Sequence, residues 1–231
     1  MTRCHGGHGE FAPDAWTSAV RTPPLYPDAV TLVPSLEAVD LLDRIDVSEG
    51  CSIKDSFSTL NLADDGFRVL FDAEWIVASS GSSSTGADWT QISRPEDLAR
   101  WEIAWAQGES QGSLFLPTLL DDQSVAVVAR VLDGQVSSGA ILYRSSDSVG
   151  LSNVFSRSGS ESETWSGLVE CAQARFPNIP LVGYESGEQL DHALDHGFRP
   201  AGSLRIWIAD GQVHDQDDRR EQGKQELRSV G

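Results

Sequence analysis

Lysine is almost absent from this chain: its 231 residues include only Lys54 and Lys224. Arginine raises the number of basic residues to 17, against 35 aspartates and glutamates, so the formal net charge at pH 7 is -18. Phosphate-binding grooves need clustered lysine and arginine, so this composition argues against a nucleic-acid partner. The acidic surface favours solubility, or the approach of cationic small molecules and basic partners.

Long apolar runs are missing as well. No segment approaches the roughly 18 to 20 apolar residues of a membrane-spanning helix, and the N-terminus lacks the apolar stretch of a signal peptide. The three cysteines, Cys4, Cys51 and Cys171, are odd in number and widely spaced, unlike a disulfide framework. We therefore expect a cytoplasmic protein with reduced thiols and no membrane partner.

Several motifs of known chemistry are also absent from the sequence. It has no Walker loop, dinucleotide fingerprint, zinc-type cysteine pair or hydrolase nucleophile elbow. His192 and His196 have the i, i+4 spacing of helical metal ligands, but no third ligand accompanies them. We predict no metal site, and the sequence shows no internal repeat.

What is present indicates a folded protein, with 39% hydrophobic residues and seven tryptophans. Residues 1–28 are rich in proline and predict an irregular arm. Residues 29–90 predict a strand, a helix capped by Ser35 and a long strand over 67–78, which either complete a sheet or form a small lobe. Residues 91–209 form the main predicted domain, and 210–231 a disordered charged tail.

The main domain begins with a helix that Ser93 and Glu96 are expected to cap. Trp101 and Trp105 belong to an apolar stripe along one side of this helix. The stripe predicts docking on a sheet, and the same helix is a candidate homodimer surface. Strands over 125–132 and 136–143 flank Asp133-Gly134, a strong hairpin signal. The remaining elements are then expected in this order: strand 149–155, helix 165–176, strand 181–184, a helix capped by Ser186 and Gln189, and a last strand over 204–208.

From residue 125 to residue 208 this order resembles the C-terminal half of the GNAT (GCN5-related N-acetyltransferase) fold, and Gly197-Phe198 matches the pair that usually ends the family's last helix. The resemblance implies an α/β fold with a mixed, mainly antiparallel sheet flanked by helices. GNAT enzymes bind acyl-CoA where two parallel strands separate. The first strand pairs with the pantetheine arm, and the next helix receives the pyrophosphate at its N-terminus.

The resemblance places acetyl-CoA or another acyl-CoA on this chain at the following cofactor-binding residues: Asn153, Val154, Phe155, Arg157, Ser158, Gly159 and Ser160. The family's turn normally carries more glycine than Arg157 to Ser160 do. Glu161 and Glu163 follow, and carboxylates there would repel a pyrophosphate. An alternative interpretation is that they complement the helix dipole, with Ser160 and Glu163 as a capping box.

Two residues at the end of the second predicted strand are catalytic candidates. Glu185 is the expected base for an amine acceptor, and Tyr184 the expected proton donor to the leaving thiolate. Their structural alternatives are a surface charge or helix cap and a core tyrosine. Many family members carry a tyrosine where this chain has Ala193, and the Asn153 amide could hold a substrate carbonyl or satisfy buried backbone.

The sequence thus predicts an acyl-CoA-dependent N-acyltransferase that acts on a small amine. The alternative is a GNAT-fold module without catalysis that binds a ligand or another protein, and the residues that favour it are Glu161, Glu163 and Ala193.

Overall fold

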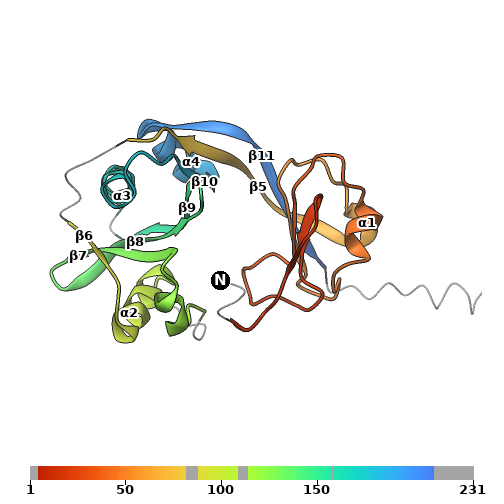
Figure 1. Ribbon diagram of the computed structural model, residues 1–231, viewed down its shortest axis with the longest axis horizontal. Helices are drawn as coiled ribbons and strands as arrows, with labels where there is room; N and C mark the ends of the chain where they lie inside the picture. The colour runs from red at the N-terminus through yellow and green to blue at the C-terminus, as the bar shows by residue number, and fades with distance from the viewer. Residues whose placement is uncertain (1–4, 82–87, 109–113, 158, 211–231) are drawn as a thin grey trace, which may run out of the picture.

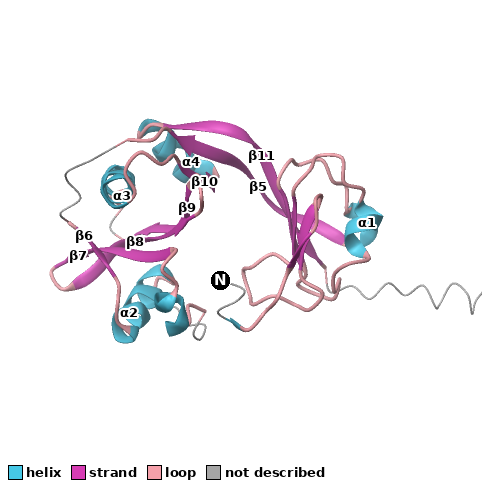
Figure 2. Ribbon diagram, viewed as in Figure 1, coloured by secondary structure: helices cyan, strands magenta, loops and turns pink. Residues whose placement is uncertain are grey.

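The computed structural model describes residues 5–81, 88–108, 114–157 and 159–210. Its 11 strands form one sheet in the order β1-β2-β3-β4-β11-β5-β10-β9-β8-β7-β6. Strand pairs β3/β4 and β9/β10 are parallel, and the other neighbours are antiparallel. The predicted class, a mixed and mainly antiparallel sheet flanked by helices, is confirmed (Figure 2).

The elements have the following bounds: β1 (Glu10–Phe11), β2 (Ala15–Thr17), β3 (Ala29–Thr31), α1 (Ala38–Leu42), β4 (Ser52–Asp55), η2 (Ala63–Asp65), β5 (Phe67–Ala78), β6 (Trp89–Gln91), α2 (Pro95–Trp105), η3 (Pro117–Asp121), β7 (Val125–Leu132), β8 (Gln135–Arg144), β9 (Val149–Ser156), α3 (Glu161–Arg175), β10 (Leu181–Glu185), α4 (Gly187–Asp195) and β11 (Phe198–Ala209).

Two lobes share the sheet, and each gives its last strand to the other. In the N-terminal lobe, β1, β2 and β3 are antiparallel neighbours, and β3 leads through α1 to the parallel β4. In the C-terminal lobe, β7, β8 and β9 repeat this arrangement, and β9 leads through α3 to the parallel β10. The strand that follows β4 is β5, which pairs with β10, and the strand that follows β10 is β11, which pairs with β4. A repeat of topology is therefore present where the sequence shows none.

The exchanged strands β5 and β11 lie side by side along their whole length, from Phe198 opposite Ala78 to Ala209 opposite Phe67. Figure 1 shows them running across the top of the molecule and connecting the lobes. Near their middle, the Arg205 guanidinium donates two hydrogen bonds to the Asp72 carboxylate, at 2.6 and 3.0 Å. The connection between the lobes is thus a two-stranded antiparallel ladder.

Helices cover both faces of the C-terminal lobe. On one, which we call the α3/α4 face, the sheet curves around α3 and α4 (Figure 1), and Trp165 and Leu168 pack against strand residues such as Leu181. On the other, the α2 face, Trp101 is fully buried and donates from Nε1 to the Val128 carbonyl at 3.0 Å. The predicted docking of α2 through its tryptophans is confirmed. Trp101 therefore belongs to the core and offers no surface to a second copy.

The two predicted capping boxes are wrong, and the one considered as an alternative at Ser160 and Glu163 does not form either. Helix α2 begins one residue later than expected, with Arg94 as its N-cap, and Arg94 pairs with Glu96. Ser160 and Ser186 are N-cap residues without a side-chain cap hydrogen bond. The expected partners accept hydrogen bonds from other elements instead: Glu163 from Arg130 of β7, and Gln189 from Trp165 of α3.

The N-terminal segment also differs from expectation, since β1 and β2 lie within residues 1–28 and add to the sheet edge. His5 reaches the C-terminal lobe, with its Nε2 2.8 Å from the Leu114 carbonyl. Among the described residues, no helix is long and apolar enough to cross a membrane.

Candidate functional site

The two parallel strands of the C-terminal lobe separate after two residue pairs. Leu181 lies opposite Val149 and Val182 opposite Gly150, and the pairing goes no further. Asn153 has a positive φ of 53°, and the register of β9 against β8 shifts at this point. An extra residue of this kind is a β-bulge, which bends its strand. The bend turns the end of β9 away from β10 and leaves an opening in the sheet.

The N-terminal lobe has a matching pair, which side chains close. β3 and β4 also pair at two positions only. Beyond them, the fully buried Asp55 accepts hydrogen bonds from the amides of Leu60 and Phe57, at 2.8 and 3.2 Å, and Thr31 Oγ1 accepts one from Ser56 at 2.8 Å. These bonds occupy backbone amides of the segment that follows β4. We therefore place the candidate site in the C-terminal opening.

The cofactor-binding residues predicted from the sequence lie along the β9 side of this opening. Val154 packs against the core on the α3/α4 face, and Phe155 meets Trp101 edge-on on the α2 face, with ring centres 5.2 Å apart. Asn153 donates from its amide to Ser152 Oγ at 3.2 Å. The structure therefore brings the predicted strand residues to the point where β9 leaves β10.

Polar groups at the end of β9 lead into the first turn of α3. The Arg157 amide donates to the Ser137 carbonyl at 2.7 Å, while the Arg157 side chain is exposed. Gly159 has a φ of 65°, and no atom lies within 4 Å of the position a Cβ would take, so its backbone is open to a ligand. Ser156 Oγ is buried and has no hydrogen-bond partner among the described residues. Ser158 lies outside the described residues.

The two glutamates in the first turn of α3 have different surroundings. Glu163 accepts a hydrogen bond from Arg130 of β7 at 3.0 Å, and the Arg130 side chain is only 18% exposed. Glu161 has no ion-pair partner among the described residues. Sequence reasoning missed Arg130, because only the pairing of β7 with β8 brings it to the start of α3. The N-terminus of α3 thus combines open amides, one paired carboxylate and a nearby arginine.

Glu185 ends β10 on the α3/α4 face. Burial raises the pKa of its carboxyl to about 7, and its neighbour across the strand pair is Glu74. It lines an open hollow of about 390 Å³ together with Ser58, whose buried hydroxyl has no partner among the described residues. A carboxyl group with a pKa near the working pH suits general-base catalysis.

Tyr184 and Glu185 point to opposite faces because they are consecutive strand residues. Tyr184 lies on the α2 face, edge-on to Trp75 with ring centres 5.6 Å apart. Burial, and secondarily the Glu185 charge, raise the pKa of the Tyr184 phenol. Lys54 Nζ lies 4.0 Å from the centre of the Tyr184 ring. Strand exchange brings Lys54 here from the N-terminal lobe. Sequence reasoning missed this residue, although a lone lysine directly after the apolar Ile53 in a short strand could have indicated it.

In α4, Ala193 packs in the core and His196 contacts neighbouring residues. Ala193 is fully buried in the core, so this position has no proton donor. The His196 ring lies 2.8 Å from the His192 carbonyl and 3.2 Å from Ser162 Oγ of α3. No cluster of three metal-binding side chains occurs among the described residues.

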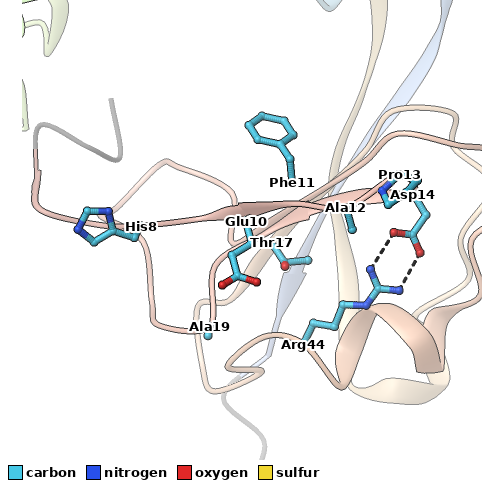
Figure 3. A pocket seen from close by; sticks show the side chains of 9 residues that line it. All are labelled: His8, Glu10, Phe11, Ala12, Pro13, Asp14, Thr17, Ala19 and Arg44. Atoms are coloured by element: carbon cyan, nitrogen blue, oxygen red, sulfur yellow. Dashed lines mark hydrogen bonds and ion pairs between the residues drawn. The ribbon is translucent and has the colours of Figure 1, made fainter.

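A second hollow, of about 800 Å³, lies at the edge of the N-terminal lobe. Figure 3 shows Arg44 reaching Asp14 there, while Glu10 and Phe11 point to opposite sides of β1. Arg44 donates to both Asp14 oxygens, at 2.8 and 2.7 Å, and lowers the pKa of that carboxyl to about 2. Arg44 and Asp14 are therefore paired with each other, and they connect the segment after α1 to the start of the sheet.

Comparisons with known proteins find similarity in structure but not in sequence. No family model matches the chain, and no curated protein matches it. A functionally unknown conserved protein from Staphylococcus epidermidis has a TM-score of 0.61 at 10% identity, over 88% of this chain and 94% of its own. A GCN5-related N-acetyltransferase from Kribbella flavida has 0.58 at 10%, over 94% and 95%. A GCN5-related N-acetyltransferase-like protein from Streptococcus suis has 0.53 at 13%, over 88% and 89%.

Proposed function

We propose that this chain, which has the GNAT fold, is an acyl-CoA-dependent N-acyltransferase that acts on a small amine. The observation that carries the proposal is the opening between β9 and β10, where a bulge at Asn153 ends the pairing of two parallel strands. Polar backbone at such an edge can pair with an extended ligand, in the way a further strand would. Glu185 lies at the rim, has no ion-pair partner among the residues described, and adds a group suited to proton transfer.

In this proposal, acyl-CoA lies with its extended arm along Asn153, Val154 and Phe155. The pyrophosphate lies at the start of α3, where helix amides and the positive end of the dipole favour an anion. Arg157, Ser158, Gly159 and Ser160 form that binding turn. Arg130 pairs with Glu163 and so reduces the repulsion that this carboxylate would exert on the phosphates.

The transfer step then needs orientation and one proton acceptor. The neutral amine attacks the thioester carbonyl, the C–N bond forms, and the C–S bond breaks. Glu185, directly or through a water, takes the proton that the attacking nitrogen loses, and the hollow beside Glu185 connects it with solvent. Tyr184 donates a proton to the leaving thiolate from the other face.

A second function is favoured by two specific observations. Position 193 carries a buried alanine and so no proton donor, and Glu161 in the first turn of α3 has no arginine partner among the described residues. A binding module with the same fold, for a ligand or a partner protein, would tolerate both. The proposal also includes a reducing compartment such as the cytoplasm, because Cys51 and Cys171 are free thiols.

Isothermal calorimetry with acetyl-CoA tests the proposal directly. We expect micromolar binding to the purified chain, and acetyl transfer to an amine that Glu185→Gln impairs without changing the affinity for acetyl-CoA. Glu188→Gln, in the first turn of α4, is the matched control. Absence of binding at millimolar acetyl-CoA would reject the transferase and support the binding module.

A further inference from the structure

Lys54 has no ion-pair partner in the part of the chain that the structure describes, although the protein is strongly acidic. Its side chain crosses the sheet on the α2 face, with Nζ 4.0 Å from the centre of the Tyr184 ring and 5.6 Å from that of Trp75. No carboxylate of the described residues lies within 4.0 Å of this nitrogen. In a chain with 35 acidic residues, the structure leaves this ammonium unpaired.

The surroundings of Lys54 explain why no carboxylate reaches it. The α2 face here carries the apolar side chains Ala73, Leu204 and Ile206, against which Trp75 and Tyr184 pack. The nearby acids point the other way: Glu74 and Glu185 line the hollow on the α3/α4 face. The nearest acid in sequence, Asp55, is hydrogen-bonded to its own loop. The carboxylates of Glu74 and Glu185 thus lie on the α3/α4 face of the sheet, and the Lys54 ammonium lies on the α2 face.

Such a cation is costly unless something else balances it. An ammonium group has three N–H donors, and none of those of Lys54 has a hydrogen-bond acceptor among the described residues. The two rings compensate only part of the lost hydration through cation–π contacts, and burial lowers the Lys54 pKa to about 8. The half-buried ammonium of Lys54 therefore has the charge and the donors to bind a compact anion.

We propose that Lys54 is the counter-ion for a carboxylate on the acceptor, so that the acceptors of this enzyme are small amino acids. This inference rests on the proposed N-acyltransferase function. The acceptor carboxylate lies against Lys54 on the α2 face, beside Tyr184, and its amine enters the opening at the end of β10. Both lobes then build one site, because β4 supplies the specificity residue and β9 and β10 supply the opening.

The scarcity of lysine allows a direct test of the anion site on the wild-type chain. With ¹³C-labelled lysine the protein gives signals from two side chains only, and Lys54→Met assigns them. We expect acetate to raise the titration midpoint of Lys54 by about one pH unit or more, since an anion that binds only the ammonium favours protonation. Acetamide, which has the same shape without the charge, should leave the midpoint unchanged. An unchanged midpoint at molar acetate would overturn the proposal.

The transfer assay tests the same residue on substrates. We compare glycine and β-alanine with their amides as acceptors. Lys54→Met should lower kcat/KM roughly 10- to 100-fold for the amino acids, the effect of one hydrogen bond to a charged group, and leave the amides nearly unaffected. Lys54→Arg, which keeps the charge, should retain much of the preference. Equal losses on acids and amides would overturn the counter-ion role.

The outcomes separate this inference from the proposed function. Acetyl-CoA binding without an acetate response contradicts the counter-ion and leaves the transferase standing. An acetate response without acetyl-CoA binding contradicts the transferase, and with it the assignment of Lys54 to an acceptor. Acetylation of Lys54 itself, seen by mass spectrometry, would also overturn the proposal, because Lys54 would then be an acceptor rather than its counter-ion.

Discussion

Glu185 differs from the carboxylates of this protein that are paired with an arginine. Asp72 is paired with Arg205, which lowers the pKa of its carboxyl, and Asp14 is paired with Arg44. Glu185 has no such partner among the described residues, and its carboxyl pKa is raised by burial. A carboxyl group that is partly protonated at neutral pH can both accept and release a proton there, which a paired carboxylate cannot.

The pH dependence of transfer should show this group. Because the base must be ionised to accept a proton, we expect kcat/KM to rise with pH through a midpoint near 7, the Glu185 pKa. Glu185→Gln should lose roughly 100-fold in rate, a typical contribution of a general base, and lose this midpoint. A full pH–rate profile of both proteins is the measurement. A profile that keeps its midpoint in Glu185→Gln would assign the titration to another group.

The same residue should affect stability with a definite sign. The Glu185 pKa is about 7 in the folded chain against 4.5 for a free glutamate, so between these values the folded chain binds more protons than the unfolded one. The free energy of unfolding contributed by this residue therefore falls as the pH rises through that window. We expect the free energy of unfolding to fall less in Glu185→Gln than in the wild type when the pH is raised from about 5 to about 8, values that bracket this window. Urea denaturation at the two pH values measures the difference. Parallel losses in both proteins would contradict the burial of this carboxyl.

At the scale of elements, the bulge in β9 is the feature on which the opening depends. Asn153 holds a positive φ of 53°, which asparagine and glycine adopt far more readily than branched residues. Asn153→Gly should keep stability and acetyl-CoA affinity, whereas Asn153→Val should cost about 1–3 kcal/mol of backbone strain and weaken acetyl-CoA binding. Chemical denaturation and calorimetry measure both. If Asn153→Gly bound acetyl-CoA but lost transfer, the side-chain amide rather than the bulge would be the group required.

The start of α3 gives a second prediction at this scale. Arg130→Gln leaves Glu163 without its partner, so the carboxylate would face the bound phosphates unneutralised. We expect acetyl-CoA affinity to fall about 5-fold, near 1 kcal/mol for an exposed charge pair, while the stability of the fold changes by less than about 1 kcal/mol. Arg130→Lys is the matched control that keeps the charge. Unchanged affinity would show that the phosphates bind away from this turn.

Local sequence patterns predicted the elements but not the details that make the site. Alternating and helical periodicities predicted the strand over 67–78, the hairpin at Asp133-Gly134 and the docking face of α2, because each depends on neighbours along the chain. The bulge has no periodic signature. The capping boxes failed because Glu163 and Gln189 have partners from other elements, Arg130 and Trp165. Such partners are set by tertiary contacts.

At the scale of the whole molecule, the exchange of β5 and β11 makes the lobes interdependent. Neither lobe has its complete sheet without a strand from the other, and the likeness to the Kribbella flavida enzyme extends over 94% of the chain. The sequence placed residues 29–90 either in the sheet or in a separate lobe, and the structure combines the two. Strand pairing across more than a hundred residues could not be deduced from local patterns.

Unfolding should therefore be a single transition. Leu204 of β11 is fully buried and lies opposite Ala73 of β5, and Leu204→Ala should destabilise the chain by about 2–5 kcal/mol. Because the lobes share this ladder, hydrogen exchange should quicken in both lobes together. The exposed Val39 of α1 supplies the control Val39→Ala. Two separate calorimetric transitions, or faster exchange in one lobe only, would contradict the coupling.

The reciprocal exchange of β5 and β11 has a consequence for assembly. A polypeptide ending after Ala78 would carry β1 to β5, with β3 on one edge of β4, no strand on the other edge and no partner for β5. A second copy offers both, since its own β5 can take the place that β11 has beside β4. Two copies of this half-length chain would then associate around a twofold axis through the middle of the ladder, near Asp72 and Arg205 in the intact protein. The full chain is, in its connectivity, a covalently linked version of that symmetric dimer, in which one half has kept an opening between its parallel strands and the other has closed it.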